Sequence, residues 1–113
     1  SGLSQAHAML QMLLGFAANN PGKNRVLIGD ALVNEDERLQ HRMNGFYDKV
    51  ELAFKGALRL AVTQGHGQEA DVAARASLLV NYVTGRWHRF AKTGFKLNPM
   101  EGTSLQLSLL LAA

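Results

Sequence analysis

The fold is decided by residues 72–90, which read VAARASLLVNYVTGRWHRF. The large apolar side chains of this stretch recur every three or four residues, which is the period of an α-helix. They form one stripe of six residues: Val72, Ala76, Leu79, Val83, Trp87 and Phe90. We therefore predict a helix over residues 69–93 that buries this stripe, with Leu78 and Tyr82 beside it.

Three further helices are predicted before this one, over residues 5–19, 21–33 and from 34 onward. Asn20-Pro21 separates the first two, because Asn caps helices and Pro suits a first helical position. The second helix is apolar around much of its circumference, so we expect it to lie beneath other elements. The third begins at a capping box, Asn34 to Glu37, and ends at Gly65-His66-Gly67. Its predicted seam is Leu39, Met43, Phe46, Val50, Ala53, Ala57 and Leu60.

The last predicted helix begins at a second capping box, formed by Thr103 and Gln106, and contains residues 105–111. Leucines face every side of it, and a domain of this size cannot enclose a helix completely. We therefore expect a second copy of the chain to cover part of it. No segment alternates apolar and polar residues over a useful length, so the predicted fold class is all-α, with five helices in one domain spanning residues 1–113.

Composition excludes several classes of protein. The 113 residues are 47% hydrophobic and 19% charged, which favours one folded domain over a disordered linker. The absence of cysteine excludes disulfides and cysteine-based zinc sites. A net charge of +3 is too small to imply nucleic-acid binding by itself. No apolar run approaches the roughly 20 residues that cross a bilayer, so no membrane association is expected.

No catalytic residue, metal site or cofactor is expected. Gly22-Lys23 is followed by Asn24, where a phosphate-binding loop needs Ser or Thr. No glutamate has a histidine three residues later, as a helical di-iron site requires. The basic group between Arg86 and Lys96 contains aromatic residues, but Trp87 and Phe90 belong to the core stripe, which favours packing over nucleic-acid binding.

Several segments, in order, resemble the C-terminal domain of TetR-family regulators. They are residues 13–22 (LLGFAANNPG), 25–27, 30–32, 36–40, 46–51, 89–90 and 94–96. The resemblance implies a homodimer in which the last two helices form a four-helix bundle with those of the partner, and so space two DNA-reading heads. Because nothing here resembles a helix-turn-helix, we expect the head that binds DNA to lie outside this chain. The resemblance further implies a cytoplasmic, nucleoid-associated regulator and no enzyme activity.

The resemblance also assigns candidate sites. One branch of the family acts in nucleoid occlusion by binding the division GTPase FtsZ, which implies a partner groove at Met12, Gly15, Asn19 and Asn20. Gly15 would leave room for a peptide, whereas Asn19 is uncharged where that branch is basic. The dimer interface is expected at Leu79, Val83, Trp87, Leu105 and Leu109.

Two alternatives stay open. In a ligand-responsive repressor, Leu13, Leu27, Phe46 and Phe54 would line a pocket for a small apolar molecule, although they could equally fill a core. In the other alternative, the chain is a freestanding helical interaction module without a DNA function. Codons for a helix-turn-helix upstream of residue 1 would exclude the freestanding module.

Overall fold

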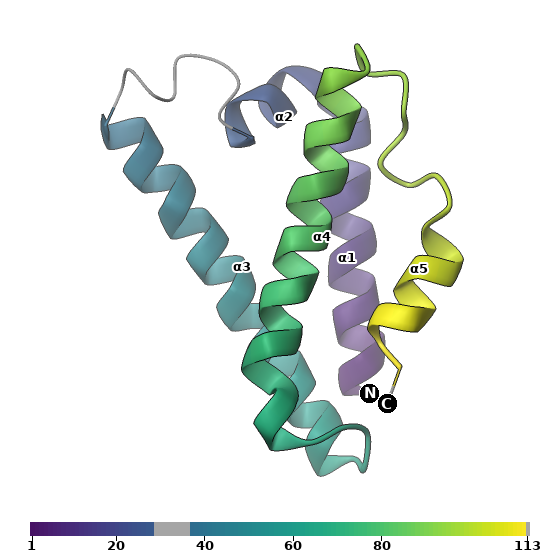
Figure 1. Cartoon of the computed structure of the whole chain (residues 1–113). Helices are drawn as coiled ribbons and strands as arrows, with labels where there is room; N and C mark the ends of the chain where they lie inside the picture. The colour runs from purple at the N-terminus through teal and green to yellow at the C-terminus, as the bar shows by residue number, and fades with distance from the viewer. Residues whose placement is uncertain (29–36, 113) are drawn as a thin grey trace.

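The computed structural model describes residues 1–28 and 37–112, and these residues contain five α-helices and no strand (Figure 1). This confirms the predicted all-α class. The helices, with a short 3₁₀ turn η2, are α1 (Gly2–Asn19), α2 (Pro21–Leu27), α3 (Glu37–Thr63), η2 (Glu69–Asp71), α4 (Val72–Lys92) and α5 (Thr103–Leu110). None of the helices in the described residues is long and apolar enough to cross a membrane.

Helices α1, α3 and α4 form the body of the domain, and α4 packs against both of the others. The amino-terminal half of α3 diverges from α4, while α2 lies at one end of the bundle and the two chain termini lie at the other (Figure 1). Helices α1 and α3 approach closely at Gly2, where an added Cβ would lie 2.3 Å from the Ala57 carbonyl oxygen. Only glycine therefore fits at this crossing.

The stripe predicted on α4 is confirmed, because all six of its residues are buried. Leu79, Val83 and Trp87 each expose 2% or less of their surface. They pack with buried residues of α1 and α3, among them Leu10, Leu14 and Phe54. Removing side chains of this size from water stabilises the fold by roughly 1.5–3 kcal/mol each, which makes α4 the centre of the core.

The seam predicted on α3 is only partly correct. Ala57 is buried, but Ala53 is exposed and Leu60 exposes 36% of its surface. The buried residues of α3 are Phe54, Ala57, Leu58 and Ala61. A straight helix drifts by about 20° per heptad relative to a seven-residue repeat, so the buried face rotates away from the predicted seam along this long helix.

Glycines end α3 and α4 in the same way. The amide of His66 donates to the Ala61 carbonyl oxygen at 2.8 Å, and Gly65 adopts a φ of +85°, as predicted for the end of α3. At the end of α4, Phe95 donates to the Phe90 carbonyl oxygen at 2.8 Å, and Gly94 has a φ of +66°. The left-handed turn that glycine adopts cheaply thus closes both helices.

The amino-terminal caps of α2 and α5 differ from the predicted ones. The capping box at Thr103 is wrong, because Gly102 is the cap residue and the Thr103 hydroxyl donates to the Met100 carbonyl oxygen. Asn20 separates α1 from α2 as predicted, but its side chain donates to the Phe16 carbonyl oxygen at 2.8 Å and so caps the end of α1. The box at residues 34–37 lies largely outside the described residues.

Helix α2 is less buried than its sequence predicted. Of its residues only Asn24 is fully buried, and Val26, Leu27 and Ile28 at its end are half-buried. The helix covers the end of the bundle instead of lying beneath other elements, so part of its apolar surface stays accessible (Figure 1). The predicted extension over residues 29–33 lies outside the described residues.

Candidate functional site

Trp87 connects the three helices that position the candidate partner groove. Its indole nitrogen donates to the carbonyl oxygen of Leu13 on α1 at 3.0 Å, and its own carbonyl oxygen accepts from Asn24 Nδ2 on α2 at 3.0 Å. Both hydrogen bonds are buried, where exchange with water is disfavoured. Asn24 Oδ1 has no hydrogen-bond partner among the described residues. The two buried hydrogen bonds fix the corner between α1 and α2 to α4.

The outer face of α1 carries three of the four residues predicted for a partner groove. Met12, Gly15 and Asn19 recur at helical spacing, and Phe16 lies among them, so we call these four residues the α1 stripe. Met12 exposes 64% of its surface and Phe16 exposes 40%. A Cβ added at Gly15 would meet nothing within 4 Å, so packing within the chain does not require this glycine.

Two residues at the end of the α1 stripe connect it to α2. Asn20 lies at this end of the stripe, where its side chain donates a hydrogen bond to the Phe16 carbonyl oxygen. The ammonium nitrogen of Lys23 lies 5.9 Å from the centre of the Phe16 ring. Neither Phe16 nor Lys23 was predicted from the sequence as a site residue. Phe16 could have been found, because it is a large aromatic residue just outside the buried stripe of α1.

The five residues predicted for the dimer interface fall into two groups. Leu105 and Leu109 expose 70% and 68% of their surface on the outer side of α5. Leu79, Val83 and Trp87 are buried in the chain's own core, because their stripe faces α1 and α3. These three therefore have no surface left for a second copy. Leu78 on α4, which was predicted only to lie beside the buried stripe of that helix, is 57% exposed.

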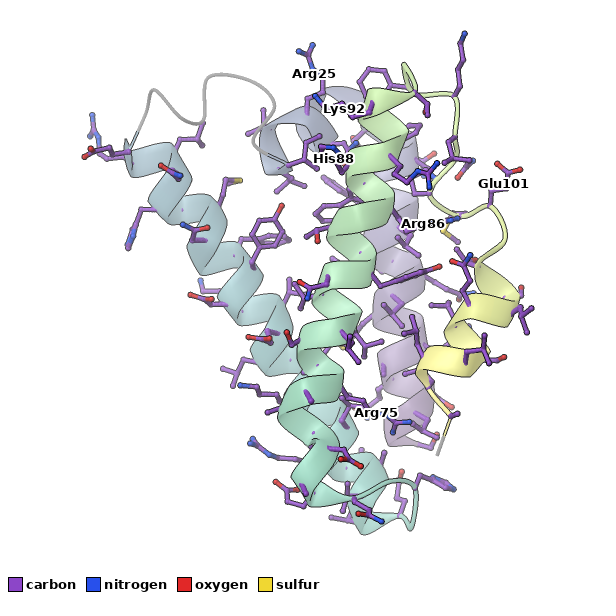
Figure 2. The ribbon with its side chains drawn as sticks, in the orientation of Figure 1. Arg25, Arg75, Arg86, His88, Lys92 and Glu101 are labelled. Atoms are coloured by element: carbon purple, nitrogen blue, oxygen red, sulfur yellow. The ribbon has the colours of Figure 1, made fainter. Side chains whose placement is uncertain are left out.

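Hydrogen bonds hold α5 and the loop before it against α4. The Tyr82 hydroxyl donates to Gln106 Oε1 at 2.6 Å, and Arg86 donates to the carbonyl oxygens of Pro99 and Glu101 (Figure 2). Burial raises the pKa of Tyr82, while the positive charge of Arg86 acts to lower it. With Leu107 buried beneath, α5 presents Leu105 and Leu109 outward.

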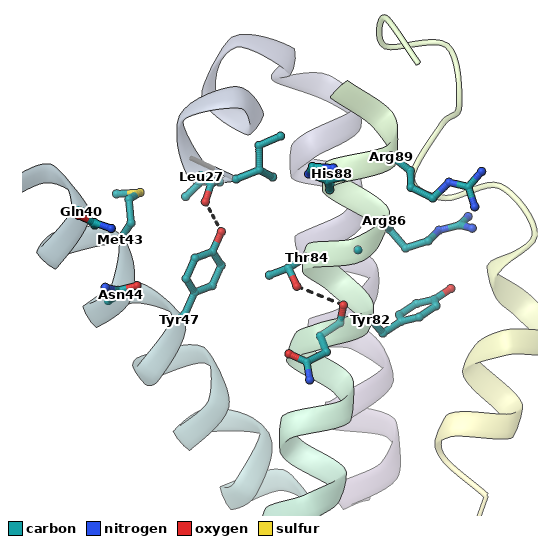
Figure 3. A pocket seen from close by; sticks show the side chains of 13 residues that line it. Leu27, Gln40, Met43, Asn44, Tyr47, Tyr82, Thr84, Arg86, His88 and Arg89 are labelled. Carbon is teal, nitrogen blue, oxygen red and sulfur yellow. Dashed lines mark hydrogen bonds between the residues drawn. The ribbon is translucent and has the colours of Figure 1, made fainter. Parts of the chain in front are cut away.

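The ligand pocket predicted from the sequence is not formed by the predicted residues. Leu13 and Phe54 are core residues, and Phe46 packs against that core. Only Leu27 lines the open groove of about 910 Å³ between α2, α3 and α4 (Figure 3). Inside this groove Tyr47 donates to the Leu27 carbonyl oxygen, and burial raises the pKa of its hydroxyl to about 12.

These features define a helical domain with a rigid body, an exposed α1 stripe and an exposed leucine pair on its last helix. The family model described as tetracyclin repressor-like, C-terminal domain, of the SlmA-like type, matches residues 2–113. The chain therefore belongs to the SlmA-like family of TetR-type C-terminal domains, which confirms the resemblance seen in the sequence. Membership of a repressor-like family makes it a regulator-type domain and not an enzyme.

Several relatives are named nucleoid occlusion factor SlmA. The protein from Idiomarina loihiensis is 41% identical over 105 residues, which are 92% of this chain and 54% of that protein. The protein from Shewanella sp. is 42% identical over 98 residues, 86% of this chain and 50% of its own length. The protein from Sodalis glossinidius is 37% identical over 111 residues, which are 97% of this chain and 56% of that protein. The chain thus spans about half the length of these relatives.

Proposed function

We propose that the chain is the dimerisation and partner-binding domain of a cytoplasmic, nucleoid-associated regulator that acts in nucleoid occlusion. The match of residues 2–113 to a SlmA-like C-terminal domain carries this proposal. DNA binding belongs to a helix-turn-helix head outside these 113 residues. The role of the chain is then mechanical, since it pairs two heads at a separation that suits two DNA half-sites.

The proposed dimer seam runs along the outer faces of α4 and α5. It comprises Leu105 and Leu109, from the predicted interface, together with Leu78. Each exposes more than half of its surface, and leucines exposed in this way favour burial against an equivalent surface. Gly85, which is exposed seven residues, or two helical turns, after Leu78, would allow close approach of a partner helix. Leu79, Val83 and Trp87 contribute to the seam only indirectly, because they pack α4 against the core of the same chain.

The proposed partner site is the α1 stripe with Asn20, and the proposed partner is the tail of FtsZ. Met12 and Phe16 provide apolar contacts, and Gly15 leaves space between them for a peptide backbone or side chain. The rigid corner held by Trp87 and Asn24 supports this role, because a preformed surface loses less entropy on binding.

The test uses the full-length, DNA-bound regulator titrated with a labelled FtsZ tail peptide, read by fluorescence anisotropy. We expect saturable binding that Met12→Ser weakens and Leu52→Ser does not. Leu52 is a matched control, since both side chains are 64% exposed and Leu52 lies on α3. Absence of saturable binding contradicts the FtsZ assignment, and a gene without helix-turn-helix codons upstream of residue 1 favours the freestanding interaction module.

A further inference from the structure

Helix α1 contains no acidic or basic side chain in its 18 residues apart from His7. The four residues of the α1 stripe are uncharged, so a charge that selects a bound molecule there has to come from a neighbouring element. Lys23 on α2 provides a charge, with its ammonium 5.9 Å from the centre of the Phe16 ring. No carboxylate in residues 1–28 and 37–112 forms an ion pair with Lys23. Its charge is available to a bound molecule.

From this arrangement we infer that Lys23 is a specificity residue, and that the α1 stripe binds an acidic peptide segment whose carboxylate pairs with Lys23. The inference rests on the proposed function for the location of the site and adds the chemistry of its occupant. An apolar side chain of the peptide lies over Gly15 between Met12 and Phe16. The carboxylate lies at the end of the stripe where Lys23 lies.

The end of α1 would ordinarily repel a carboxylate, because the last carbonyl groups of a helix carry partial negative charge. Asn20 reduces this repulsion by donating from its side chain to the Phe16 carbonyl oxygen at 2.8 Å. The aromatic ring of Phe16 also holds the lysine ammonium close to the stripe, since a ring face attracts a cation. Both features favour an anion at this position.

The geometry also sets the spacing within the peptide. The Lys23 ammonium lies 5.9 Å from the Phe16 ring centre, and an ion pair adds a few ångströms. An extended chain advances about 3.3 Å per residue, and a helix about 5.4 Å per turn. The carboxylate is therefore separated from the apolar anchor by about two or three residues in an extended peptide, or by between about one and two turns in a helical one.

One experiment measures binding of the FtsZ tail peptide to full-length, DNA-bound protein at low and high salt. We expect Lys23→Glu to weaken binding about tenfold and Lys23→Gln about threefold, as for a single exposed charge contact. Lys23→Gln should also reduce the salt dependence of binding. Lys49→Glu, at an exposed position on α3, makes the same charge change and should have no effect. Equal affinities for all four proteins would overturn the role of Lys23.

A second experiment keeps the inference testable if the FtsZ peptide does not bind, which would contradict the proposed partner alone. A random peptide library is selected on the 113-residue chain and then on its Lys23→Glu variant. We expect the wild-type chain to enrich peptides with Asp or Glu two or three residues from an apolar anchor, on one consistent side of it, and the variant to lose this preference. Selected peptides without a carboxylate, or no peptide that competes at the α1 stripe, overturn the inference.

Discussion

The indole nitrogen of Trp87 lies 3.0 Å from the backbone carbonyl oxygen of Leu13 and donates a hydrogen bond to it across the core. Trp87 is 1% exposed and Leu13 is 8% exposed, so water does not compete for this bond. Because the two residues are 74 positions apart, the bond joins the first and the fourth helix. It determines how the α1 stripe is placed relative to α4.

Trp87→Phe should destabilise the domain by about 2 kcal/mol, because it removes this buried hydrogen bond and leaves a cavity. Urea denaturation followed by far-ultraviolet circular dichroism measures the change, since Trp87 is the only tryptophan and its fluorescence is lost in the variant. Tyr82→Phe removes the exposed bond to Gln106 and should cost less than about 1 kcal/mol. Equal losses for the two variants would argue against a special role of the buried bond.

Stability should fall at alkaline pH because of Tyr47. Burial raises the pKa of its hydroxyl from 10.0 to about 12, so the folded state holds this proton more tightly than the unfolded state does. The resulting stabilisation is present below pH 10 and is lost as the pH rises towards about 12. Urea midpoints measured across this interval should decline more steeply for the wild type than for Tyr47→Phe. Parallel declines would show that Tyr47 contributes nothing to the pH dependence.

Leu109→Asp should shift the proposed dimer to a monomer without loss of helix content. The side chain is 68% exposed in the single chain, so a carboxylate is tolerated there but not in an apolar seam. Light scattering measures the mass, and circular dichroism the helicity. Leu52→Asp, at an exposed leucine on α3, should leave the mass unchanged, whereas Leu107→Asp should unfold the domain because Leu107 is 1% exposed. A Leu109→Asp variant that stays dimeric would contradict the proposed seam.

Gly15→Ala should stabilise the domain and yet weaken partner binding. Alanine favours a helix interior over glycine by about 0.5–1 kcal/mol, and an added Cβ at this position meets nothing within 4 Å. The same methyl group occupies the space proposed for the partner. Gly56→Ala on α3 is the matched control, with equally free space and no place in the α1 stripe. Thermal denaturation and peptide titration test the two effects separately, and unchanged binding in Gly15→Ala would show that a partner does not use this space.

Sequence patterns alone were enough to predict the five α-helices of the described residues, the buried stripe of α4 and the glycine that ends α3. Each of these follows from local chemistry, namely a 3.6-residue period or a backbone conformation that glycine adopts cheaply. The resemblance also directed attention to Met12, Gly15 and Asn19, which share one exposed face. Hydrophobic periodicity identifies the face of a helix that is buried, but it does not identify the element or chain that covers that face.

Which apolar residues face the chain's own core, and which stay exposed, depends on how the helices pack together. Leu79 and Leu109 look alike in the sequence, yet one is fully buried against α1 and α3 and the other is 68% exposed. The Trp87–Leu13 bond and the position of Lys23 over Phe16 likewise depend on how separate helices meet. The physical reason is that such contacts join residues distant in the chain or across a corner, where helical spacing carries no information.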